Sequence, residues 1–201
     1  MKMVQLIDDK DVAEVLIDPI RRTILTVLAD EEMTESMLAR HLGFTESAIG
    51  HHLRVLEREK LIRISKQVPE NHGIIQKFYA AEAKAYIIDT RKLPIKISKY
   101  FQPVNIERVR SLLSIMRVER KTLLTDQTIE ELALNLTNLI AESAEAYNDQ
   151  DFDGDREEAY MRIYSKAFET FVLKYGRRLD MGGEIESGSK TESIKMKVRE
   201  G

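Results

Sequence analysis

Residues 45–54, with the sequence TESAIGHHLR, place hydrogen-bonding side chains at positions that share one face of a helix. At about 3.6 residues per turn, Ser47, Gly50, His51 and Arg54 point away from the apolar side. Serine and histidine donate to or accept from base edges, arginine binds guanine or phosphate, and glycine leaves room for close approach. This face is therefore suited to the major groove of DNA, which is about 12 Å wide and admits one helix.

The elements that must position this face can be predicted from capping residues. Thr45 is a suitable N-cap for a helix over residues 46–60, whose apolar positions fall on the opposite side. A shorter helix over residues 35–42 precedes it, with Thr34 as N-cap and Gly43 as its end. Two helices joined through a glycine are typical of a helix-turn-helix.

The flanking segments extend this pattern to a winged helix-turn-helix. Upstream, Asp18 is positioned to cap a helix that starts at Pro19, and a short helix over residues 11–17 comes before it. Downstream, residues 61–68 and 74–79 are β-capable runs separated by a loop, which predicts a hairpin that would serve as the wing.

Three stretches of these residues resemble the ArsR-type winged-helix regulators. Residues 18–25, DPIRRTIL, are similar to the family's first-helix pattern D-P-x-R-x-x-I-L, and residues 38–43, LARHLG, to its L-A-x-x-L-G turn. Residues 45–62 resemble its recognition helix, with Lys60 in place of the usual glycine. The resemblance covers residues 11–85, and the longer helical remainder is similar to extended ArsR-like regulators of archaea.

This resemblance implies a homodimer that binds double-stranded operator DNA through a recognition helix, residues 45–60, and a wing, residues 61–80. The residues expected to contact DNA are Thr45, Ser47, Gly50, His51, Arg54 and Arg58 from the helix, and Arg63, Lys66, Asn71 and Lys77 from the wing.

The net charge of −3 does not argue against a DNA partner, because the charges are unevenly placed. Residues 1–85 carry 12 basic and 14 acidic side chains, so one copy of the domain should bind weakly and a dimer more strongly. Residues 91–121 carry 9 basic and 2 acidic side chains, and residues 122–158 carry 1 basic and 11 acidic ones. These two blocks could pair within one chain or between chains.

The remainder of the chain is predicted to be helical, which gives a mainly α (α+β) fold class. We expect a basic linker over residues 91–99, a helix that starts near Pro103, an amphipathic helix from Thr128 and a last helix capped by Asp155. The expected domains are a DNA-binding domain over residues 1–85, a helical dimerisation region over 86–181 and a disordered tail over 182–201.

Seven of the thirteen Phe and Tyr residues lie between Tyr147 and Tyr175. Aromatic side chains at helical spacing usually form a core or a dimer interface, whereas the sharper hypothesis is a pocket for a small-molecule effector. The sequence leaves this choice open.

Metal sensing is not expected, and the cofactor prediction is none. The chain has no Cys, and Thr34 and Ser36 occupy the positions of the family's C-x-C pair, where hydroxyls are poor ligands for thiophilic metals. Residues 149–154, DQDFDG, imitate the first half of a calcium loop, but Tyr160 stands where a bidentate glutamate is needed. An acidic loop between two helices is the simpler interpretation.

The sequence also lacks the nucleophile elbow, Walker A and dinucleotide-binding motifs, so we do not expect an enzyme. No apolar run approaches the length of a membrane span and no secretion signal is evident, which favours a cytoplasmic protein without a membrane partner. The prediction is a sequence-specific transcription regulator. The alternative is a helical protein–protein adaptor that uses its winged helix as an interaction module.

Overall fold

The computed structural model describes residues 1–69, 75–115 and 125–176. Its first helices are α1 (Lys10–Val15), α2 (Pro19–Asp30), α3 (Glu35–Leu42) and α4 (Glu46–Arg58). The predicted N-caps are confirmed, because Asp18, Thr34 and Thr45 each accept a hydrogen bond from a backbone N–H of the following helix. Gly43 ends α3 with φ of 74°, a left-handed conformation that favours glycine.

The predicted wing is present as the strands β3 (Ile62–Pro69) and β4 (Ile75–Ala81), which pair antiparallel. The register shifts between Ile64 and Lys66. A third strand, β2 (Met33–Thr34), pairs with β4 and was not predicted, since two residues carry no periodic signal. The fold class agrees with the prediction: a winged helix followed by further helices.

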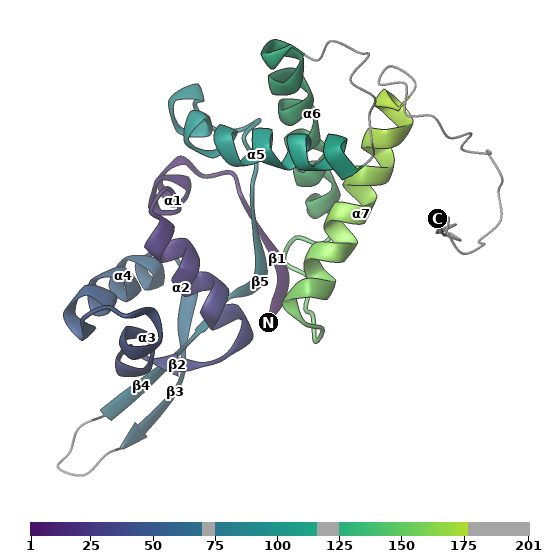
Figure 1. The fold of residues 1–201 in the computed structure, drawn as a ribbon. Helices are drawn as coiled ribbons and strands as arrows, with labels where there is room; N and C mark the ends of the chain where they lie inside the picture. Colours follow the sequence, from purple (N-terminus) through teal and green to yellow (C-terminus); the bar gives the residue numbers. More distant parts are fainter. Residues whose placement is uncertain (70–74, 116–124, 177–201) are drawn as a thin grey trace, which may run out of the picture.

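A second sheet joins parts of the chain that are far apart in sequence. Strand β1 (Lys2–Ile7) pairs in parallel with β5 (Ala83–Ile88), so that Val4 lies opposite Ala85. The winged helix therefore lies between two paired strands in the sequence. In Figure 1, β1 and β5 run side by side between the α2–α4 bundle and helices α6 and α7. The predicted domain boundary at residue 85 falls inside β5.

Helices α5 (Ile95–Ile115), α6 (Asp126–Glu145) and α7 (Arg156–Tyr175) complete the described chain. The prediction that α5 starts near Pro103 is wrong, because the helix already begins after Pro94, whose carbonyl accepts the Ser98 N–H. Pro103 instead lies inside the helix. The predicted cap of α7 is confirmed, since Asp155 accepts the N–H of Glu158. The tail over residues 182–201 lies outside the described residues.

Two hydrophobic cores are present. The first lies mainly inside the winged helix, where Ile24, Leu38 and Leu53 are almost fully buried, and it also includes Ile7 of β1 and Ile97 of α5. The second is formed by α5, α6 and α7 together with Met3 and Val4 of β1 and Ala85 and Ile87 of β5. Its aromatic members, Phe171 and Tyr175 among them, agree with the core interpretation of the aromatic stripe.

An ionic network connects the end of β5 to α6. Asp89 is fully buried, and Arg91 donates to its Oδ1 over 2.7 Å and to its Oδ2 over 2.8 Å. The same guanidinium reaches Glu142 and Glu145 of α6, at 3.1 and 2.6 Å. Within the described residues, Arg110 also lies 3.6 Å from Asp126. The basic and acidic blocks of the sequence therefore pair within one chain.

Within the described residues, none of the helices is long and apolar enough to cross a membrane.

Candidate nucleic-acid interface

Helix α4 separates its side chains cleanly into an inner and an outer face. Ile49, Leu53 and Leu56 are buried to 1% exposure or less and hold the helix against the first core. On the outside lie exposed residues spaced 4, 3 and 4 apart, which is one face of a helix: Ser47, His51, Arg54 and Arg58. We call these four residues the outer face of α4.

Gly50 corrects one sequence prediction. It is buried instead of facing outward, because α4 crosses α3 at this position. A Cβ built on Gly50 would lie 2.6 Å from the Glu35 Oε1 of α3. The glycine therefore serves the packing of the two helices and does not belong to the outer face.

His52 connects α4 to the start of α2. Its side chain is only 14% exposed, and its Nδ1 lies 3.6 Å from Asp18 Oδ2. Burial lowers the pKa of His52 below 6.5, although the nearby Asp18 carboxylate acts in the opposite direction. His52 is thus partly buried, whereas the neighbouring His51 is exposed.

The two arginines of the outer face differ in whether they pair with another residue of the protein. Arg54 is exposed and makes no hydrogen bond or ion pair with another residue in the described part of the chain. Arg58 donates to the Glu59 carboxylate over 2.7 Å. A group without a carboxylate partner loses nothing inside the protein when it binds an external acceptor, so Arg54 is the stronger candidate for a DNA contact.

The wing residues fall into three groups. Lys77 is exposed, and Lys66 is exposed while its Nζ lies 4.2 Å from the ring centroid of Phe78 and 3.7 Å from Glu32. Arg63 is turned back along the sheet, where it donates to the Ala81 carbonyl over 2.9 Å. Asn71 lies outside the described residues. Lys66 and Lys77 are thus the wing cations that the structure leaves at the surface.

Sequence reasoning overlooked two basic residues in the last turn of α3. Arg40 and His41 are both exposed, just before Gly43 turns the chain toward α4. In a helix-turn-helix the first helix crosses the DNA backbone, so these residues are further candidates for phosphate contacts. Their position just before the Gly43 turn was the signal available in the sequence.

Two acidic residues at the ends of the loop after α6 have partners within the protein. Asp149 accepts a hydrogen bond from Lys2 over 2.6 Å, and Asp155 caps α7. Across the residues that the structure describes, no group of three or more His, Cys, Asp or Glu side chains is arranged to hold a metal ion.

Comparison with protein families finds a match to the model described as "Bacterial regulatory protein, arsR family", over residues 18–63. The matched segment begins at the cap of α2 and ends at the second residue of β3, so it contains α2, α3 and α4. No curated protein matches the chain.

Proposed function

Because residues 18–63 form a DNA-binding helix-turn-helix of the ArsR type, we propose that the chain is a transcription regulator that binds operator DNA as a homodimer in the cytoplasm. The observation that carries this proposal is the outer face of α4, where exposed hydrogen-bonding and cationic side chains stand on a helix fixed by a buried opposite face. No catalytic role is part of the proposal.

In the proposed complex α4 lies in the major groove. Ser47, His51 and Arg54 then face base edges, which is where sequence is read. Arg58 and the wing lysines Lys66 and Lys77 contact phosphates and set the register, together with Thr45 at the helix start. Thr45 already accepts the Ala48 N–H, and its hydroxyl hydrogen remains available to a phosphate oxygen.

The homodimer is proposed because one copy offers few free cations. On the α4 surface Glu46 is exposed and Glu57 is partly exposed, so they oppose the field of Arg54 and Arg58. Phosphate neutralisation supplies most of the affinity that is independent of sequence. Two copies on half-sites about 34 Å apart double the number of contacts and impose a palindrome on the operator.

The decisive experiment selects bound genomic fragments with the purified full-length chain at two salt concentrations. We expect a palindromic sequence to be enriched and its affinity to fall steeply as salt increases. Arg54→Ala should weaken binding to that sequence by about 1–3 kcal/mol and leave the dimer intact. The matched control is Arg162→Ala, which removes the same charge from an exposed position on α7.

Two outcomes contradict the proposal. If Arg54→Ala and Arg162→Ala weaken binding equally, α4 is not the reading helix and only the overall charge matters. If no fragment is enriched and binding does not depend on salt, the winged helix is an interaction module of a protein–protein adaptor.

A further inference from the structure

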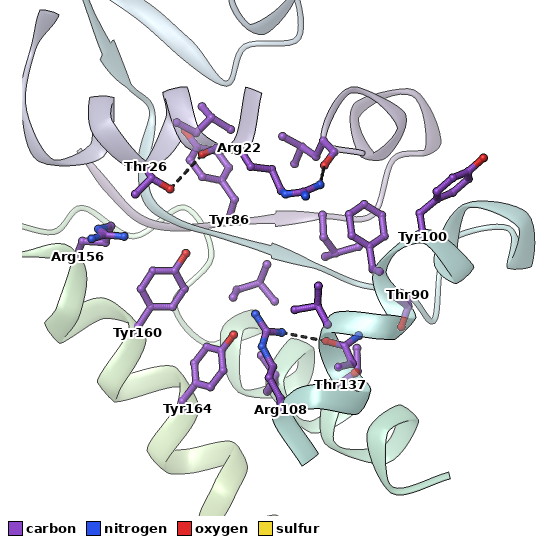
Figure 2. A pocket seen from close by; sticks show the side chains of 18 of the residues that line it. Arg22, Thr26, Tyr86, Thr90, Tyr100, Arg108, Thr137, Arg156, Tyr160 and Tyr164 are labelled. Atoms are coloured by element: carbon purple, nitrogen blue, oxygen red, sulfur yellow. Dashed lines mark hydrogen bonds between the residues drawn. The ribbon is translucent and has the colours of Figure 1, made fainter. Parts of the chain in front are cut away.

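A cavity of about 350 Å³ lies between the winged helix and the C-terminal helices. On one side it is lined by Arg22, Leu25 and Thr26 of α2, and its other walls come from β5, α5, α6 and α7. Figure 2 shows side chains from both cores around this space. Its volume falls within the range of roughly 300–1,000 Å³ that is usual for small-molecule sites.

The charged residues around the cavity are all cationic. Arg22, Lys84, Arg108 and Arg156 line it, and the described lining includes no Asp or Glu. A site with this lining favours an anion over a cation or a neutral molecule.

Three of these four cations are already bound to backbone or carboxylate oxygens. Arg22 donates to the Leu16 and Ile17 carbonyls, and Lys84 donates to the Ala29 carbonyl. Arg156 lies 3.1 Å from Asp30 Oδ2. Arg108 differs, since it donates its hydrogen bond to the neutral amide oxygen of Asn105, over 3.0 Å. Arg108 is therefore the cation best able to accept an anionic ligand.

The remaining walls are largely apolar or aromatic. Tyr160 and Tyr164 pack edge to face, with ring centroids 5.8 Å apart, and the Arg108 guanidinium carbon lies 5.5 Å from the Tyr164 ring centroid. Both tyrosine hydroxyls point toward the cavity in Figure 2. Burial raises the pKa of both groups, so at neutral pH each hydroxyl is a neutral hydrogen-bond donor.

We propose that this cavity binds a small aromatic carboxylate. Arg108 holds the carboxylate, because a guanidinium matches its two oxygens. The ring lies among the aromatic side chains of α5 and α7. One guanidinium without a carboxylate or backbone carbonyl partner suits a single negative charge, and the apolar walls disfavour a phosphate or a sugar acid.

The position of the cavity gives such a ligand a regulatory consequence. It would contact α2 of the DNA-binding unit and α5 and α7 of the helical unit at once, and so favour one arrangement of the two units over others. The binding proposal does not depend on DNA recognition, because binding is measured on the protein alone.

The test is calorimetric titration of the full-length chain with indole-3-acetate and with its neutral analogue indole-3-acetamide. We expect the carboxylate to bind at least about tenfold more tightly, since a hydrogen bond to a charged group contributes about 1.5–3 kcal/mol. Arg108→Met should weaken indole-3-acetate binding by a similar factor. Tyr164→Phe, which keeps the ring, should weaken it less, and the control Arg162→Ala should leave it unchanged.

Equal binding of the acid and the amide would overturn the proposal, as would an absence of binding at millimolar concentration or an Arg108→Met variant that binds normally. Tighter binding of octanoate than of indole-3-acetate would overturn the choice of an aromatic ligand. Because Arg108 is exposed, its substitution should leave the fold intact, and near-ultraviolet circular dichroism checks this. If Arg108→Met does not fold, the proposal is decided by two other measurements: the affinity of indole-3-acetate relative to indole-3-acetamide, and the loss of indole-3-acetate affinity in Tyr164→Phe.

Discussion

His52 places a titratable group in the contact between α2 and α4. Its Nδ1 is buried and has no hydrogen-bond partner among the described residues, and the same holds for the Nε of Arg21 nearby. Besides Asp18, the charged or titratable neighbours that influence His52 are Arg21 and His51, and both lower its pKa. A proton on His52 therefore opposes the packing that positions the outer face of α4.

The chain should lose stability as the pH falls through the range in which His52 titrates. Because the pKa of His52 is lowered in the folded chain, the unfolded chain binds a proton at this residue just below pH 6.5 while the folded chain keeps it neutral. The stabilising contribution of neutral His52 to the free energy of unfolding is thus complete above pH 6.5. It is lost as the pH falls toward the pKa of His52 in the folded chain. His52→Gln should reduce this slope in denaturant titrations between pH 8 and pH 5.

The matched control is His41→Gln, which replaces an exposed histidine on α3. It should leave the pH dependence of the unfolding free energy as it is in the parent chain. An unaltered slope in His52→Gln would show that this histidine is not the group responsible.

At the scale of single residues, sequence reasoning succeeded where a helical period decides orientation. It placed Ser47, His51 and Arg54 outward, and they are exposed. It failed for Gly50, because a residue without a side chain gives no sign of which face it occupies. Only the proximity of Glu35 on a second helix shows that this position faces inward.

At the scale of elements, the helices with local start signals could be predicted and the strands with distant partners could not. Asp18, Thr34, Thr45 and Asp155 each cap a helix through a hydrogen bond formed within three residues. The partner of β1 lies about eighty residues away in β5, so no local pattern reports the pairing. The sequence offered a pocket as one use of the aromatic residues, but it could not locate the cavity, because the walls come from five separate elements.

The ionic network after β5 predicts unequal effects for two of its members. Arg91→Gln leaves the buried Asp89 carboxylate with Lys92, whose Nζ lies 3.9 Å from Asp89 Oδ2, as its remaining ion-pair partner among the described residues. We expect this change to lower the free energy of unfolding by about 3 kcal/mol, the cost of breaking a buried pair. Glu142→Gln removes an exposed partner and should cost less than about 1 kcal/mol.

Chemical denaturation of both variants measures the difference. Equal losses would mean that breaking the pair with the buried Asp89 costs no more than removing an exposed partner of Arg91. The pKa of Asp89 is held below 3.8, chiefly by its hydrogen bonds from Arg91. The contribution of this pair to the free energy of unfolding should therefore be present above pH 3.8 and disappear in stronger acid.

At the scale of the whole molecule, the chain consists of two cores that meet at the parallel pair of β1 and β5. Val4 is fully buried in the second core, although it precedes the winged helix in sequence. Val4→Asp would place an unpaired charge there and should cost on the order of 4 kcal/mol. We expect amide hydrogen exchange to accelerate in α6 and α7 and to stay slow in α2, α3 and α4.

The control for this experiment is Lys2→Gln. Lys2 lies on the same strand as Val4, and its substitution removes only a partly exposed ion pair with Asp149. Accelerated exchange in every helix of the Val4→Asp variant would contradict the division into two cores, since both would then unfold as one unit.

The position of β1 also determines the order in which the two cores can form during synthesis. The winged helix is nearly contiguous in sequence, and its core is complete once Ile97 has been made. The second core needs Met3 and Val4 together with residues as late as Tyr175. At usual translation rates, Tyr175 is added on the order of ten seconds after Val4. During that interval the nascent chain carries a folded DNA-binding unit and an apolar N-terminal strand whose helical partners have not yet been made.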